Sequence, residues 1–242
     1  NGGAVYFYEG FSQSGSGEIE VTAPSIFIGQ ADHSQINEIA LTTNAGDITL
    51  NFNEAGGTIG LYSGEAQAAS ITTTSGDIAI RRAADYVGTL GAVEIKKVAD
   101  GESTITSGGS FSITESASVL IDGGVINAAA GDSLCASDGD MTLSGTARIA
   151  ANTSSSQSII LVCGQAATLA APAKMRIDPG VSLLAGGAES GKLRIFSTDF
   201  NSNTISPSAN LNTGHFSKAT GARDLHNFYN IAYTAGGLPA QY

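Results

Sequence analysis

The stretch Ser75-Gly76-Asp77-Ile78-Ala79-Ile80 decides the fold of this chain, because variants of it recur along the sequence. Each copy has a Gly, then an acidic or hydroxyl residue, then apolar residues at every second position. The copies begin at Gly17-Glu18, Gly46-Asp47, Gly76-Asp77, Gly109-Ser110 and Gly139-Asp140. Their second residues are 29, 30, 33 and 30 positions apart. A step of about thirty residues is typical of repeat proteins, in which each period forms one structural unit.

Each period reads as three short β-strands without a helix. In the clearest one, apolar and polar residues alternate over 47–52, 58–62 and 69–73, and Gly, Asn or Ser separate the segments. Alternation of this kind indicates half-buried strands. The sequence therefore predicts an all-β, right-handed parallel β-helix whose coils stack about 4.8 Å apart. The residues expected to point inward in vertical stacks are Ile48, Leu50, Ile78, Ile80, Phe111, Ile113, Met141 and Leu143.

The organisation along the chain follows from where this pattern holds. Residues 1–14, which include Val5-Tyr6-Phe7-Tyr8, are expected to form a leading strand or a cap, and 15–200 the solenoid. Within the solenoid, 81–103 is irregular and charged, which predicts an outward loop. Residues 201–242 are irregular and are expected to cap the last coil or to take part in assembly, because an uncovered coil edge would pair with other strands.

Composition restricts the function. The chain has 242 residues, with 11 Lys and Arg against 22 Asp and Glu, for a formal charge of −11. Such a charge does not attract nucleic acid or an anionic membrane, and no run of apolar residues is long enough for a transmembrane helix. The acidic, lysine-poor composition favours an extracellular or surface protein. The N-terminus lacks the features of a signal peptide, so we expect a processed chain or a piece of a longer one.

The acidic position of the repeat is a candidate metal site. Stacked coils would place Glu18, Asp47, Asp77 and Asp140 at one corner, where oxygen ligands could bind calcium between turns. The alternative, which the sequence favours, is an Asx-type turn in which each carboxylate accepts a hydrogen bond from nearby backbone. No motif for any other cofactor is present.

The two cysteines, Cys135 and Cys163, lie close to one repeat apart in the sequence. Residues one coil apart have Cα atoms near 5 Å, within the range of a disulfide. We therefore expect a disulfide between successive coils if the protein is extracellular, and two buried thiols otherwise.

Catalysis is the weaker hypothesis. Polysaccharide cleavage needs two carboxyl groups, which could come from Asp122, Asp132, Asp138 and Asp140. However, Trp is absent and few aromatic residues lie in the middle of the chain. The three histidines, His33, His215 and His226, are not part of a nucleophile or metal motif.

Aromatic residues gather at the two ends of the chain and suggest assembly. They are Tyr6, Phe7, Tyr8, Phe228, Tyr229, Tyr233 and Tyr242. Aromatic side chains are enriched at protein interfaces, and a contact between two different ends propagates as a filament. Copies of the chain are therefore one expected partner.

Segments such as SITTTSGDIAI and EIALTTNAGDITL resemble the secreted β-helical adhesins of bacteria, the filamentous haemagglutinin-like group, over about residues 15–200. The resemblance implies a right-handed parallel β-helix outside the cell that binds or assembles, and it implies no catalytic residue. The expected function is a non-enzymatic structural or adhesive protein, a building block of a surface fibre, sheath or adhesin shaft. Its partners would be its own copies, a receptor or a polysaccharide. The alternative is a β-helix that binds or cleaves a polysaccharide.

Overall fold

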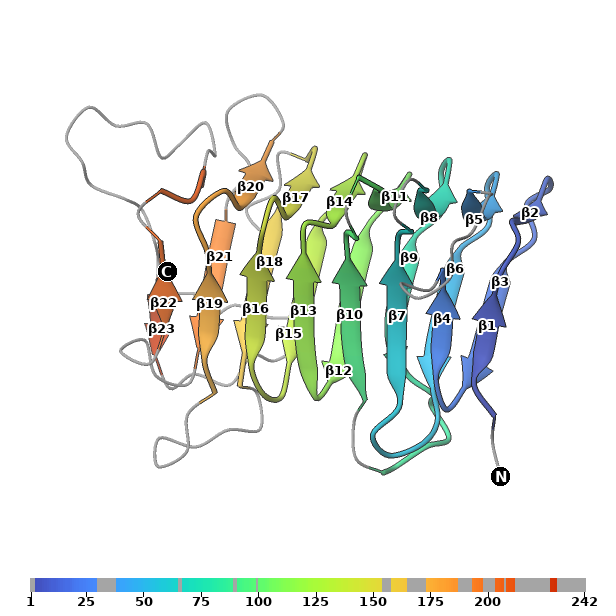
Figure 1. The fold of residues 1–242 in the computed structure, drawn as a ribbon, viewed down its shortest axis with the longest axis horizontal. Coiled ribbons are helices and arrows are strands. Elements are labelled where there is room, and N and C mark those ends of the chain that lie inside the picture. The colour runs from blue at the N-terminus through green and yellow to red at the C-terminus, as the bar shows by residue number, and fades with distance from the viewer. Residues whose placement is uncertain are drawn as a thin grey trace.

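The computed structural model shows a parallel β-solenoid, in which three parallel sheets run the length of the molecule (Figure 1). It describes residues 3–29, 38–64, 67–88, 91–98, 100–153, 158–164, 173–186, 193–197, 203–206 and 208–211, together with the strand 227–229. The described part contains no helix. The predicted fold class is therefore confirmed.

Each coil contributes one strand to each sheet, in chain order, except that the last described coil contributes to the first and third sheets. The first sheet consists of β1 (Val5–Phe7), β4 (Ile26–Ile28), β7 (Thr58–Tyr62), β10 (Ala92–Lys96), β13 (Ser118–Asp122), β16 (Met141–Ser144), β19 (Met175–Ile177) and β22 (Thr204–Ile205). The second consists of β2 (Phe11–Gln13), β5 (Ile39–Thr43), β8 (Ala69–Thr73), β11 (Ser103–Ser107), β14 (Val125–Ala128), β17 (Arg148–Ala151) and β20 (Ser182–Ala185). The third consists of β3 (Ile19–Ala23), β6 (Ile48–Phe52), β9 (Ile78–Arg82), β12 (Phe111–Ser116), β15 (Ser133–Ser137), β18 (Ile159–Cys163), β21 (Leu193–Ser197) and β23 (Asn227–Tyr229).

The winding is right-handed. In Figure 1 the chain rises along the first sheet, crosses over in the second and descends along the third, while it advances from the N-terminal to the C-terminal end. Crossover connections between parallel strands take this hand almost without exception, because of the right-handed twist of the strands.

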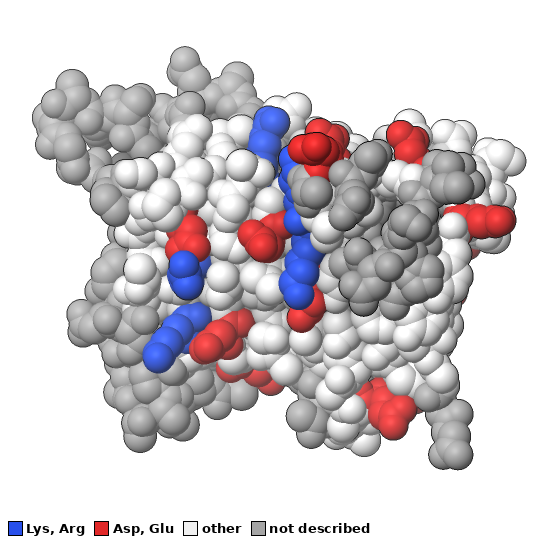
Figure 2. Space-filling model, in the orientation of Figure 1, with Lys and Arg blue, Asp and Glu red and all other residues white. Residues whose placement is uncertain are grey.

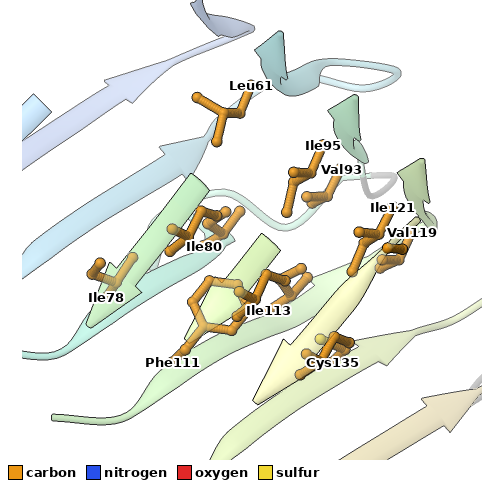
Figure 3. Packing of buried hydrophobic residues seen from close by; sticks show 14 of the residues in the cluster. Leu61, Ile78, Ile80, Val93, Ile95, Phe111, Ile113, Val119, Ile121 and Cys135 are labelled. Atoms are coloured by element: carbon orange, nitrogen blue, oxygen red, sulfur yellow. The ribbon is translucent and has the colours of Figure 1, made fainter. Parts of the chain in front are cut away.

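Apolar side chains stack inside the solenoid in rows that run along its axis (Figure 3). Ile78 is in register with Ile48 on one side and Phe111 on the other, and these side chains are at most 1% exposed. All eight residues expected to point inward are buried. The inward assignment is therefore confirmed.

Coil length varies more than the repeat predicts. In the row that contains Leu50, the successive partners are Ile80, Ile113, Cys135, Leu161 and Ile195. The coil from Ile113 to Cys135 is the shortest of these, and the coil from Leu161 to Ile195 is the longest.

The short coil moves one copy of the motif out of the third sheet. Met141, which follows Gly139-Asp140, begins β16 of the first sheet and pairs with Val119. The equivalent position in the third sheet is Asp132, which follows Gly131 as Ser110 follows Gly109.

The sequence analysis expected the irregular stretch 81–103 to form an outward loop, but part of it is a strand of the first sheet. It contains β10, whose Val93 and Ile95 are 1% exposed and pair with Ile59 and Leu61. Lys96, one of the charges that suggested a loop, occupies an outward position of this strand, as does Glu94.

Candidate interaction surface

The acidic corner of the third sheet is held by hydrogen bonds between coils. Asp47 Oδ1 accepts a hydrogen bond from the backbone N–H of Asp77 at 2.7 Å, and Asp77 Oδ1 accepts one from Ser110 at 2.7 Å. Ser110 Oγ in turn accepts from the N–H of Asp132 at 3.3 Å. Each side chain thus accepts a hydrogen bond from backbone, as the alternative interpretation expected, but the donor belongs to the next coil and not to a local Asx-type turn.

The calcium hypothesis for this corner is wrong in its grouping of residues. Asp140 lies immediately before β16 of the first sheet, where its Oδ1 accepts a hydrogen bond from the N–H of Lys174 at 2.7 Å. Glu18, Asp47 and Asp77 occupy equivalent, exposed positions in successive coils. Among the described residues, no three His, Cys, Asp or Glu side chains gather as a metal site would require.

The glycines of this corner explain why the motif begins with Gly. A Cβ atom added to Gly76 would lie 2.3 Å from the carbonyl oxygen of Gly46, which is backbone of the preceding coil. Only glycine allows coils to approach this closely. Beneath the turn, Thr73 Oγ1 donates a hydrogen bond to the Gly46 carbonyl at 3.1 Å and accepts one from the N–H of Gly76 at 2.9 Å.

The two cysteines are free, buried thiols, so the expected disulfide is not formed. The register between β15 and β18 places Cys163 beside Ser137 and Cys135 beside Leu161. A diagonal neighbour two residues along the next strand is about 7–8 Å away, beyond the reach of a disulfide. Burial raises the pKa of each thiol to about 12. Cys135 instead takes a core position, and Cys163 Sγ lies 3.4 Å from the carbonyl oxygen of Gly139.

The carboxylates proposed for catalysis do not form one site. Asp122 ends β13 and accepts a hydrogen bond from Ser144 Oγ at 2.9 Å, whereas Asp132 lies after β14, immediately before β15 of the third sheet. Asp138 is instead close to Arg82 and Glu115. Arg82 Nη2 lies 2.6 Å from Glu115 Oε1, and burial, with the nearby Glu115 charge, raises the pKa of Asp138 against the lowering effect of Arg82.

Glu115 has an unusual backbone. It is the described non-glycine residue with a positive φ, 54°, and it lies where the register between β12 and β15 shifts between Ile113 and Ser116. A bulge of this kind redirects a side chain at the edge of a strand. Glu115 was not among the residues selected from the sequence, and no local sequence signal marks its conformation.

An aromatic strip lies on the outer face of the first sheet, over β1, β4 and β7. Tyr6 is in register with Phe27, and Phe27 with Gly60. The ring of Tyr62 folds back over Gly60, since a Cβ atom there would meet Tyr62 Cε2 at 2.4 Å. Ring centroids are separated by 5.7 Å between Tyr8 and Tyr6, 5.1 Å between Tyr6 and Phe27, and 6.2 Å between Phe27 and Tyr62.

The rings of this strip stack on one another instead of forming an open platform. Their planes differ by 5°, 23° and 22°, which at these separations is offset stacking. A sugar chain that bound by ring stacking would need the faces that these rings present to each other. The strip is therefore better suited to extension by a further ring at its end than to binding along its length.

Tyr62 marks the end of the strip, where charged residues begin. Its hydroxyl donates a hydrogen bond to Glu94 Oε2 at 2.6 Å, and Lys96 Nζ lies 2.6 Å from the same oxygen and 5.6 Å from the Tyr62 ring centroid. Burial raises the pKa of Tyr62, and Glu94 raises it further. Burial alone would raise the pKa of Glu94, but the hydrogen bonds from Lys96 and Tyr62 lower it below its usual value.

Five of the seven aromatic residues expected to take part in assembly lie in the described part of the structure. Tyr6 and Tyr8 are 42% and 47% exposed on the first coil, whereas Phe7 packs against the core. Phe228 and Tyr229 belong to β23, which pairs with β21. Tyr233 and Tyr242 lie outside the described residues. Within the described residues, the exposed aromatic surface expected for assembly therefore lies on the first coil, at Tyr6 and Tyr8.

A second apolar layer was missed by the sequence analysis. Ala136, Ile160, Val162 and Phe196 point to the outer side of the third sheet, and yet they are at most 4% exposed. The signal was the uninterrupted apolar run Ile159-Ile160-Leu161-Val162-Cys163, which is typical of a strand buried on both faces.

Comparison with known proteins finds no matching family model, and neither a curated protein nor a solved structure gives a significant match. In the described residues, no helix has the length and apolar character needed to cross a membrane. The proposals below therefore depend on the geometry of this chain.

Proposed function

We propose that this chain is a non-enzymatic structural or adhesive protein of the cell exterior, similar to the filamentous haemagglutinin-like adhesins in its use of a solenoid shaft. Its β-solenoid would be a building block of a surface fibre, sheath or adhesin shaft. The observation that supports this best is that all three sheets continue from the first coil to the last but one, and two of them to the last described coil. Each added coil lengthens such a rod without a change in its cross-section.

Electron microscopy of the purified chain tests this proposal. We expect rods or fibres whose width equals that of one solenoid or of a small bundle. A surface-binding assay on cells or immobilised glycans, with the chain as the probe, would separate adhesion from a purely structural role. Featureless monomers that bind neither cells nor glycans would contradict both roles.

Polysaccharide cleavage is the second candidate function, and the cluster of Arg82, Glu115 and Asp138 favours it. It combines two carboxyl groups with a guanidinium, and the raised pKa of Asp138 is the change that a general acid requires. Incubation with acidic polysaccharides, followed by a reducing-sugar assay, tests this. Activity that is lost in both Glu115→Gln and Asp138→Asn would establish the enzyme, and no release of sugar would remove it.

A further inference from the structure

We propose that the first coil is the acceptor end of a head-to-tail contact, in which the C-terminal coil of a second copy extends all three sheets in parallel. The inference rests on the proposed function and adds which ends meet, and in which orientation.

The backbone of the first coil is ready to accept further strands. Among the described strands, β1, β2 and β3 each have a neighbour on one side. Gly29 N–H donates to the Phe7 carbonyl at 3.3 Å, and Asn44 N–H donates to the Gln13 carbonyl at 3.2 Å. Because alternate residues of a parallel strand bond to opposite neighbours, the backbone groups of Tyr6 and Ser12 point away from the solenoid. In β3 the same holds for Glu20, since Ile19 N–H donates to Asp47 O at 2.9 Å.

The side chains at this end are also incompletely covered. Phe11 is in register with Leu41, which is 1% exposed, but Phe11 itself is 51% exposed. Three of the four large exposed hydrophobic residues in the described part, Tyr6, Tyr8 and Phe11, belong to the first coil, and the fourth is Val87. Only another coil of the same three-sided cross-section would pair with all three edges and cover the inward residues at once.

The C-terminal end of a second copy has this shape. The first and third sheets end there in β22 and β23, and the second ends in β20, beside which Asn210 forms a parallel bridge with Ser182. A copy shifted along the solenoid axis presents these strands in the same direction, so every new pair is parallel, like the pairs within the chain. A two-fold contact between two first coils would instead oppose the strand directions.

The distribution of charged residues along the chain favours the same head-to-tail arrangement. Residues 1–80 contain nine Asp and Glu and no Lys or Arg, whereas 173–242 contain six Lys and Arg and four Asp and Glu. On the face in Figure 2, blue atoms lie over the middle and C-terminal coils, and only red atoms lie over the N-terminal ones. Since salt screens charges beyond about 8 Å at physiological ionic strength, the charges at the two ends act separately. An acidic end attracts a basic end and repels its own copy.

Two variants test the orientation, and each is designed to block one end of the solenoid: Phe11→Asp the first coil and Ile205→Pro the C-terminal end. Phe11→Asp would bury an unpaired charge when a second copy docks, but leaves the exposed side chain in water in the monomer. Ile205→Pro removes an N–H that points away from β19, because Ser206 N–H is the one that donates to Ile177 O at 2.8 Å. Val87→Asp is the matched control, since Val87 is 92% exposed and lies away from the first coil, between β9 and β10. Circular dichroism checks that each variant is folded.

Sedimentation velocity reads the outcome. We expect polymers of the wild type and of Val87→Asp, monomers of either blocked variant alone, and a one-to-one dimer when the two blocked variants are mixed. If the wild type polymerises but the mixture stays monomeric, or Phe11→Asp polymerises like the control, the orientation is wrong and the structural function stands. A wild type that remains monomeric at high concentration contradicts self-assembly itself.

Cross-linking gives a second measurement if Ile205→Pro does not fold. Tyr6 and Thr204 occupy outward positions of the two terminal strands of the first sheet, which the contact would bring one strand spacing apart. Tyr6→Cys mixed with Thr204→Cys should give a mixed disulfide dimer after oxidation, because the native thiols are at most 1% exposed. A dimer of Tyr6→Cys with itself would show a two-fold contact and overturn the proposal.

Discussion

Inside the solenoid each coil repeats the coil before it, whereas the outer surface changes along the axis. The inward row through Leu50, Ile80, Ile113, Cys135 and Leu161 is apolar and at most 1% exposed, although the coils that supply it differ in length. The outer face of the first sheet begins with stacked aromatic rings over β1, β4 and β7. It continues with charged residues such as Glu94 and Arg176 over β10 and β19.

This difference separates what determines the fold from what can carry function. An inward residue needs the right size and polarity to cover the coil on either side, so one short pattern suffices for every coil. Loops of different length project outward without disturbing that stack. The outer face is free of this requirement, and its variation along the axis is what gives the rod two distinguishable ends.

The largest expected effect comes from breaking the interior. Ile78→Asp places a charge between Ile48 and Phe111, where Ile78 is 0% exposed. We expect it to lower the free energy of unfolding by more than about 4 kcal/mol, because no partner is available for a buried carboxylate. Urea denaturation followed by circular dichroism measures this. Ala79→Asp is the control, since the next residue points outward; equal stability of the two variants would contradict the inward assignment.

The interior was also the part that the sequence predicted well. Alternation around Ile48 and Ile78 is a local signal, and stacking preserves it in every coil. The register of the middle coils was not predictable from a constant step, because the short coil after Phe111 moved Met141 into another sheet. The Arg82–Glu115–Asp138 cluster depends on a bulge and on that register, so nothing local in the sequence indicated it.

The corner glycines should be the next most sensitive. In Gly76→Ala the new methyl group would meet backbone atoms of Gly46 at 2.3 and 2.6 Å, so the two coils must separate locally. We expect a loss of roughly 2–4 kcal/mol, in the range of overpacked cores or above. Gly56→Ala should lose about 1 kcal/mol, because its φ is +69° but nothing lies within 4 Å of a Cβ atom. Gly3→Ala, with neither constraint, should be neutral. Thermal melts of the three variants give the ranking, and a neutral Gly76→Ala would contradict the close approach.

A smaller effect is expected from the hydrogen bonds that the carboxylates of Asp47 and Asp77 accept between coils at the same corner. Asp77→Ala removes the acceptor for the Ser110 N–H, which should lower stability by about 1 kcal/mol. Asp77→Asn keeps an oxygen at that position and should be close to the wild type. If the corner bound calcium, Asp77→Asn would be as harmful as Asp77→Ala, and calcium would raise the wild-type melting temperature while EDTA lowered it. We expect neither reagent to change it.

The smallest effect should come from the outer face, at the boundary between aromatic and charged residues. Tyr62→Phe keeps the ring stacked on Phe27 but removes the hydrogen bond to Glu94, for a loss of about 0.5–1.5 kcal/mol at neutral pH.

In the wild type the folded-state pKa of Glu94 is lowered, so its contribution to stability is full above the usual carboxyl pKa and is lost as the pH falls through the lowered one. Without the Tyr62 hydroxyl this pKa rises towards its usual value. The Glu94 part of the acid-side decline of the melting temperature should therefore be smaller in Tyr62→Phe and should be complete at a higher pH, and Glu94→Gln should remove it. Profiles of melting temperature from pH 7 to pH 3 for the wild type and both variants measure this; superimposable profiles would show that Glu94 does not depend on the aromatic strip.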